Sequence, residues 1–251
     1  MKLATLLIFQ VPIICFFLIQ SAYANSSEDE VGMFVMELVP YGFTKENGEQ
    51  TGVLLDVLNE IRDVSGVGLP VKTLPLKRLL LTVLKDMKSC TLVIDSPIVI
   101  DNLDLIEPIG YELTAGILPL FGVKLTDYSS LKGKLIAVPL GVQFDEEFNT
   151  DTSLNKVSTP EYINAIKMMK VGHVDAVAGA IPVLKYLATK EGLHAQFFDQ
   201  PLILVEKDMY LACSFNLTKN ERRKLQQAVM GLRLSGKTQK FFDRYLSLPN
   251  Q

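Results

Sequence analysis

Tryptophan is absent from this sequence, histidine occurs only twice, and there is no run of lysine or arginine. Nucleic-acid-binding surfaces usually need a basic patch, so nucleic acid is not an expected partner. His173 and His194 lie far apart and lack acidic or cysteine neighbours at the spacing of metal ligands. The sequence also has no Gly-x-Ser-x-Gly motif, phosphate-binding loop or convincing Cys–His pair. We therefore expect no catalytic residues, no metal and no cofactor.

The first 24 residues predict a signal peptide. Lys2 precedes an apolar stretch over residues 3–19, and Ala22-Tyr23-Ala24 supplies the small-x-small pattern of a signal-peptidase site. Cleavage is expected after Ala24, which implies export. A membrane anchor is the alternative, but the stretch has about the minimum spanning length and is followed by acidic residues.

The sequence contains only three cysteines, and one of them is expected to be removed with the signal peptide. Cys15 lies within the expected signal peptide, without the small residue that a lipoprotein site needs just before its cysteine. Cys90 and Cys213 remain after processing, in a chain of 227 residues with 24 basic and 28 acidic side chains. In an oxidising compartment an even pair suggests a disulfide, but two buried free thiols explain the pair equally well.

Strand and helix patterns alternate along the remainder, which indicates an α/β fold with mostly parallel sheets. No second apolar segment reaches membrane length, and no internal repeat is evident. Residues 158–161, Ser-Thr-Pro-Glu, predict a capping box that opens a helix ending near Val171. Strands are expected at 33–38, 71–74, 91–95, 114–123, 134–139, 175–181, 196–205 and 209–214. Helices are expected at 53–61, 77–88, 144–149, from the capping box at 158–161 to about 171, 220–233 and 234–245.

Three stretches together resemble the polar amino-acid family of extracytoplasmic solute-binding proteins of bacterial ABC importers. They are "VPYGFTKENGEQTGVLLDVLNEI" (39–61), "DYSSLKGKLIAVPLGVQFDEEF" (127–148) and "MKVGHVDAVAGAIPVLKYLA" (169–188). The resemblance implies a type II periplasmic-binding-protein-like fold: two α/β lobes, a cleft between them, and two crossover strands near 110–114 and 207–210. Lobe 1 would comprise residues 25–111 and 209–251, and lobe 2 residues 112–208.

The residues that hold an amino-acid zwitterion in this family are missing here. The position matching Ala180 is typically an acid that pairs with the ligand's ammonium group. The position matching Val99 is typically an arginine, whose planar fork meets both carboxylate oxygens. Residues 95–108, "DSPIVIDNLDLIEP", contain no basic residue at all. A standard amino acid held in the family's usual way is therefore not expected.

Other residues remain as candidates for contact with a small polar or anionic solute. Tyr41 and Phe43 match the aromatic wall of the family's cleft, and Ser96 matches its hydroxyl contact, although Ser before Pro is also ordinary turn chemistry. Arg78 would stand near a helix N-terminus that opens on the cleft, with a solvated surface arginine as the alternative. Backbone N–H groups of Gly141, Val142 and Gln143 could receive an oxygen, or these residues form only a tight turn.

Three functions are compatible with the resemblance. The first is a monomeric periplasmic binding protein that delivers its solute to an ABC permease, and the second is a ligand-sensing subunit for a membrane sensor kinase. The third is a periplasmic enzyme of the same fold, similar to cyclohexadienyl dehydratase, which would need a carboxyl or imidazole group with a shifted pKa in the cleft. Glu107 and Glu206, near the crossovers, are the candidates for that role.

The family's topology also bears on the two cysteines. It makes the strand that follows Cys90 an antiparallel neighbour of the strand that contains Cys213, at roughly the same height. A disulfide is then expected, whereas a shift of register by one residue would turn the two side chains to opposite faces.

Overall fold

The computed structural model describes residues 30–85, 87–140, 144 and 146–246. The expected signal peptide (1–24) and the turn Gly141–Gln143 lie outside these ranges. Among the described residues, no helix is both long and apolar enough to cross a membrane.

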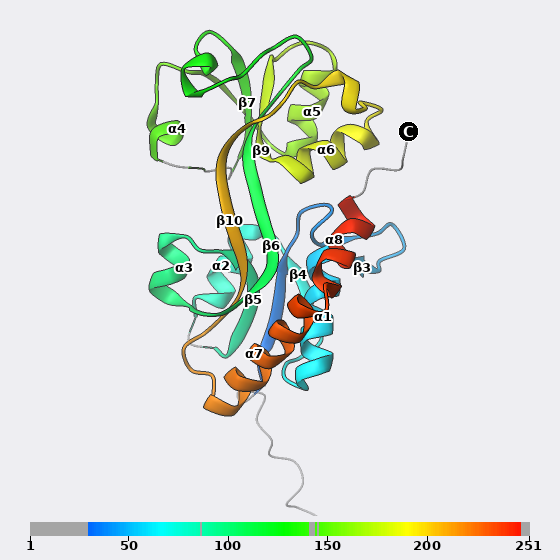
Figure 1. Cartoon of the computed structure of the whole chain (residues 1–251), viewed down its shortest axis with the longest axis vertical. Helices are drawn as coiled ribbons and strands as arrows, with labels where there is room; N and C mark the ends of the chain where they lie inside the picture. Colours follow the sequence, from blue (N-terminus) through cyan, green and yellow to red (C-terminus); the bar gives the residue numbers. More distant parts are fainter. Residues whose placement is uncertain (1–29, 86, 141–143, 145, 247–251) are drawn as a thin grey trace, which may run out of the picture.

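The chain forms two lobes, one above the other in Figure 1, connected by two long strands. A continuous eight-stranded sheet runs through both lobes in the order β4-β1-β5-β10-β6-β9-β7-β8. Neighbours within β4-β1-β5 and within β9-β7-β8 are parallel, whereas β10 and β6 pair antiparallel with their neighbours. The strands of this sheet are β1 (Gly32–Met36), β4 (Lys72–Leu74), β5 (Ser89–Ile94), β6 (Asp104–Pro119), β7 (Leu135–Pro139), β8 (Asn155–Thr159), β9 (Ala176–Ala180) and β10 (Leu202–Cys213).

Helices flank both halves of the sheet. The lower lobe in Figure 1 holds α1, α2, α3, α7 and α8, so the C-terminal helices return to the half in which the described chain begins. The upper lobe holds α4, α5 and α6. The helices are α1 (Val53–Ser65), α2 (Leu76–Val83), α3 (Pro97–Asn102), α4 (Glu146–Thr150), α5 (Tyr162–Lys170), α6 (Ile181–Lys190), α7 (Lys219–Leu234) and α8 (Lys237–Leu246); a short hairpin joins β2 (Phe43–Thr44) to β3 (Gln50–Thr51).

Strands β6 and β10 belong to both lobes. Ile106 and Ile109 of β6 are buried in the lower core, whereas Ile117 and Leu118 of the same strand are buried in the upper cores. At Gly116 the partner strand comes so close that a Cβ atom would lie 2.1 Å from the Leu202 carbonyl oxygen. The two strands therefore form one tightly paired connection between the lobes.

The observed elements confirm the predicted α/β alternation, with several local differences; the largest is that β6 begins at Asp104, ten residues before the strand expected at 114–123. Residues 155–159 form β8, and Ser158 and Thr159 end this strand instead of capping a helix. Glu161 is the N-cap residue of α5, and no side chain caps that helix. Pro97 is the first residue of α3, a short helix that was not expected. The last extended region is one continuous strand, β10.

The disulfide expected from the resemblance is present. Cys213 of β10 pairs directly with Cys90 of β5 in antiparallel register, with 4.0 Å between their Cα atoms. Both residues are fully buried in the core of the lower lobe. The bond therefore ties the C-terminal end of β10 to β5 in the lower lobe.

Reduction of this disulfide should lower the free energy of unfolding by about 2–4 kcal/mol, because the bond closes a loop with a sequence separation of 123 residues. Urea unfolding with and without reductant measures the change. Alkylation before reduction, followed by mass spectrometry, gives the matched chemical test. Two alkylated cysteines in the unreduced mature protein would contradict the bond.

Candidate functional site

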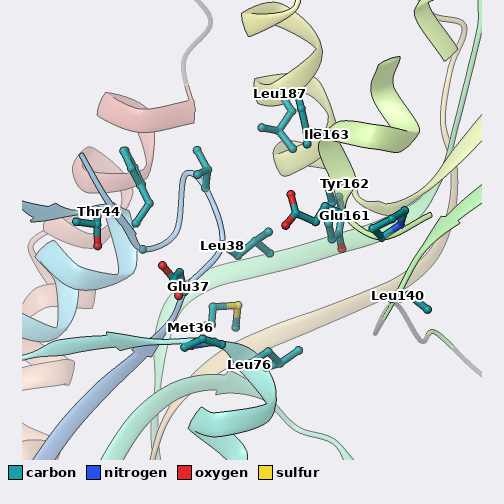
Figure 2. A pocket seen from close by; sticks show the side chains of 15 residues that line it. Met36, Glu37, Leu38, Thr44, Leu76, Leu140, Glu161, Tyr162, Ile163 and Leu187 are labelled. Carbon is teal, nitrogen blue, oxygen red and sulfur yellow. The ribbon is translucent and has the colours of Figure 1, made fainter. Parts of the chain in front are cut away.

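A cavity of about 700 Å³ lies between the two lobes, with walls from both (Figure 2). The lower lobe contributes the segment after β1, the β2 strand and the start of α2. The upper lobe contributes the residue after β7, the start of α5 and one residue of α6. The described lining residues are Met36, Glu37, Leu38, Val39, Gly42, Phe43, Thr44, Pro75, Leu76, Leu140, Pro160, Glu161, Tyr162, Ile163 and Leu187.

The lower wall is held in place by the N-terminus of α1. The N–H groups of Val53 and Leu54 donate to the carbonyl oxygens of Pro40 and Tyr41, at 3.0 and 2.8 Å. Gly52, at φ 137°, permits this approach, since a Cβ atom there would lie 2.4 Å from the Tyr41 carbonyl oxygen. Two of the unpaired N–H groups that begin a helix are thus used within the protein and are not available to a ligand.

The upper wall begins where β8 ends. Glu161 has extended backbone as the N-cap of α5, and its side chain is exposed. Figure 2 shows the Glu161 carboxylate projecting into the space between the lobes, on the side of Leu38 and Glu37. Ile163 and Leu187 lie beside it as apolar parts of the same wall.

The charge in the cavity has one sign. Glu37 and Glu161 are the charged residues among the described lining residues, which include no lysine, arginine or histidine. Within the described part of the chain, neither carboxylate forms an ion pair. The rest of the lining is largely apolar. The cavity therefore has a negative character against apolar walls.

Three tyrosines lie close together where the lobes meet: Tyr162 lines the cavity, and Tyr41 and Tyr111 do not. Burial raises the pKa of Tyr41 well above its usual value, and the nearby Tyr111 and Tyr162 phenols raise it further. Burial also raises the pKa of Tyr111, partly opposed by an interaction with the Tyr41 hydroxyl. That interaction falls short of a normal hydrogen bond, because the buried Tyr41 hydroxyl has no partner of standard geometry among the described residues. Burial raises the pKa of Tyr162 to about 12, although a hydrogen bond from the backbone of Ala180 lowers this pKa by a smaller amount.

The residues expected at the site are distributed over several environments. Phe43 lines the cavity, whereas Tyr41, on the same turn, is buried in the lower core and does not line it. Arg78 is exposed on α2, outside the lining formed by its neighbours Pro75 and Leu76. Gly141, Val142 and Gln143 lie outside the described residues.

Ser96, Val99 and Ala180 also lie outside the cavity lining. Ser96 is the N-cap of α3 and makes no side-chain cap bond. Val99, which the resemblance matches to the family's arginine, is buried in a small apolar cluster with Leu79 and Val83. Ala180, which the resemblance matches to the family's acid, is 8% exposed and packs with the core of the lower lobe. Both positions thus serve packing in this chain.

The two candidate enzyme carboxylates do not line the cavity either. Glu107 accepts hydrogen bonds from Arg233 and Gln226 of α7, at 2.8 and 3.2 Å. Glu206 is exposed on β10. Within the described residues, no three His, Cys, Asp or Glu side chains gather as metal ligands.

Glu37 and Glu161 were not among the residues expected at the site. Glu37 comes directly after β1, and a charged side chain at the carboxyl end of a parallel strand is a recognisable signal for a binding site. Glu161 is the last residue of the predicted capping box, so its carboxylate was expected to bind the helix N-terminus and not a ligand.

Comparison with solved structures shows that this fold is shared by ligand-binding proteins, while neither protein-family models nor curated proteins give a match. A mutant of the arginine-binding protein ArgBP from T. maritima has a TM-score of 0.68 at 18% identity, over 87% of this chain and 96% of that one. The GluR0 ligand-binding core from Nostoc punctiforme, in complex with L-glutamate, has a TM-score of 0.67 at 20% identity, over 87% and 100%. A histidine kinase sensor domain similar to periplasmic binding proteins has a TM-score of 0.68 at 13% identity, over 90% and 100%. The type II periplasmic-binding-like fold implied by the resemblance is confirmed.

Standard L-amino acids should bind weakly or not at all, because the resemblance matches Val99 and Ala180 to the charged pair that holds the zwitterion, and both are buried apolar residues here. A thermal-shift panel at millimolar amino acid tests this expectation. At millimolar concentration, an amino acid with a micromolar Kd would add about 4 kcal/mol to the free energy of unfolding. This corresponds to a rise in Tm of roughly 10 °C. A shift of that size with any common amino acid would contradict the prediction.

The buried phenols should make the protein sensitive to alkali. Above about pH 10 tyrosine ionises in the unfolded chain, while the raised pKa of Tyr41 keeps it protonated in the folded one, so stability is lost as the pH rises. Tyr41→Phe should change the free energy of unfolding by less than about 1 kcal/mol at pH 8 and should be more stable than wild type at pH 11. Urea unfolding at both pH values measures this, with Tyr186→Phe, on α6, as the control. Equal losses in wild type and Tyr41→Phe would contradict it.

Proposed function

We propose that this chain is a periplasmic solute-binding protein, related to the polar amino-acid family of ABC importers, that captures a small polar solute between its lobes. The observation that carries the proposal is the cavity of about 700 Å³, to which both lobes contribute walls. A solute that contacts both walls stabilises the arrangement in which the lobes are close together. Binding can then be read from outside as a change of shape.

Lobe closure would be a rotation about the two connecting strands. We take residues 25–111 with 209–251 as one moving unit and residues 112–208 as the other. The boundaries fall where Asp208 pairs with Glu112 and Lys207 with Leu113. Lys207 also donates to the backbone oxygen of Asp95 at 2.6 Å and forms a 3.3 Å ion pair with its carboxylate. This contact joins the hinge region to the end of β5.

The partner would be an ABC permease or a membrane sensor that recognises the closed form. Both kinds of assembly occur among proteins of this fold, which include a substrate-binding domain of a putative amino acid ABC transporter and the histidine kinase sensor domain. Export with cleavage after Ala24 would place the mature protein, as a monomer, in the periplasm with such a partner. A binding role also suits the positions of Glu107 and Glu206, neither of which lines the cavity.

Purification from the native host, followed by native mass spectrometry, should reveal a solute that co-purifies with the protein. Addition of that solute to the unliganded protein should lower the radius of gyration in small-angle X-ray scattering, because the lobes close on it. An unchanged scattering profile at saturation would contradict closure, and turnover of the solute into a product would favour an enzyme.

A further inference from the structure

We propose that the solute is an organic cation, an amine or guanidine without a carboxylate, bound between Glu37 and Glu161. This inference rests on the proposed binding function and specifies the chemistry of the solute. It follows from the charge of the walls, the energetics of closure and the apolar surface around the two carboxylates.

The two carboxylates belong to opposite walls. Glu37 follows β1 of the lower lobe, and Glu161 begins α5 of the upper lobe. Both side chains are exposed in this structure, and Figure 2 shows them on either side of Leu38. A ligand between the walls therefore meets a negative group on each side.

Closure of the lobes would be costly for these carboxylates without a cationic ligand. A carboxylate that loses water and gains no partner pays a large desolvation penalty, and two carboxylates in one closed space also repel each other. The described lining residues supply no positive side chain to offset either effect. A positively charged ligand offsets both, whereas an anion increases the repulsion. The closed form is thus favoured selectively by a cation.

The helix termini near the cavity do not reverse this preference. At α1 the N–H groups of Val53 and Leu54 already donate to backbone carbonyls. The N-terminus of α5 carries a partial positive charge equivalent to about half a unit, which balances only part of the adjacent Glu161 carboxylate. α2 begins at Leu76, two residues after Leu74, whose carbonyl oxygen accepts from the Glu37 N–H at 2.7 Å, so the partial positive charge of α2 likewise balances only part of the Glu37 carboxylate. The net charge of the described walls remains negative.

The surfaces around the carboxylates suit an apolar ligand body. Leu76 and Leu140 line opposite sides of the cavity and are 43% and 70% exposed in this structure. Ile163 and Leu187 add apolar surface next to Glu161. Covering such side chains stabilises a complex in proportion to the apolar area removed from water. An alkyl or aryl body with a cationic head provides both contacts.

Matched pairs of ligands test the charge requirement directly. Agmatine and 1,5-diaminopentane are the decarboxylated counterparts of L-arginine and L-lysine, so each pair differs only by a carboxylate. Isothermal titration should give a Kd at least 10-fold lower for each amine than for its amino acid. Neutral 1,5-pentanediol and anionic glutarate should not bind, and affinity for the amines should fall as the salt concentration rises.

Isosteric variants assign the effect to the two residues. Glu37→Gln and Glu161→Gln should each weaken amine binding at least 10-fold while the far-ultraviolet circular dichroism stays unchanged. Glu46→Gln is the matched control, because Glu46 is exposed in the turn after β2 and does not line the cavity. This control should bind amines like the wild-type protein.

The outcomes separate this inference from the proposed function. Tighter binding of the amines, lost in the two glutamine variants, supports both. If an anionic, neutral or zwitterionic solute from a broad panel closes the lobes and amines do not, the cation inference is wrong and the binding function stands. If no solute of any charge class changes Tm or scattering, both are overturned. Amine binding that survives in both glutamine variants also overturns the inference.

Discussion

The antiparallel pairing of β6 with β10 is the constraint on which the rest of the structure depends. Each strand is long enough to enter the core of both lobes, so each lobe completes its sheet with part of the same two strands. The close approach at Gly116 leaves no room for a side chain between them. Ala180 and Val183 of the upper lobe pack in the same buried cluster as the lower core, so rotation of one lobe against the other would bend this connection and change that contact.

The cavity follows from the direction of the other strands. β1 of the lower lobe and β7 and β8 of the upper lobe all end on its walls, because Met36, Leu140 and Pro160 are lining residues. Binding sites in α/β sheets form at the carboxyl ends of parallel strands, where short loops expose side chains and backbone groups. Here two such edges face each other. The chemistry of the site then depends on the loop residues, of which Glu37 and Glu161 are the charged ones among those described.

Much of the fold could be predicted from the sequence because apolar periodicity dominates the core elements. Val53, Leu54, Val57, Leu58 and Ile61 recur at helical spacing and are buried on α1 as expected. β8 could not be recognised, because Asn155–Thr159 is polar and partly exposed at a sheet edge. The site was harder to predict, since Tyr41 and Phe43 share one turn and only tertiary packing decides which of them lines the cavity. Glu161 could not be predicted as a cavity residue, because the sequence does not show that the upper wall begins at α5.

The return of the C-terminal helices to the lower lobe has a consequence for the order of folding. α1 packs against α7, which lies more than 150 residues later in the sequence. During synthesis from the N-terminus, all elements of the upper lobe are made before α7. The apolar face of α1 that packs against α7 therefore stays uncovered until Lys219–Leu234 has been made. A half-made lower lobe exposes the kind of surface that aggregates during synthesis. The part of this chain that is made first therefore stays incompletely packed for longer than the part that is made later.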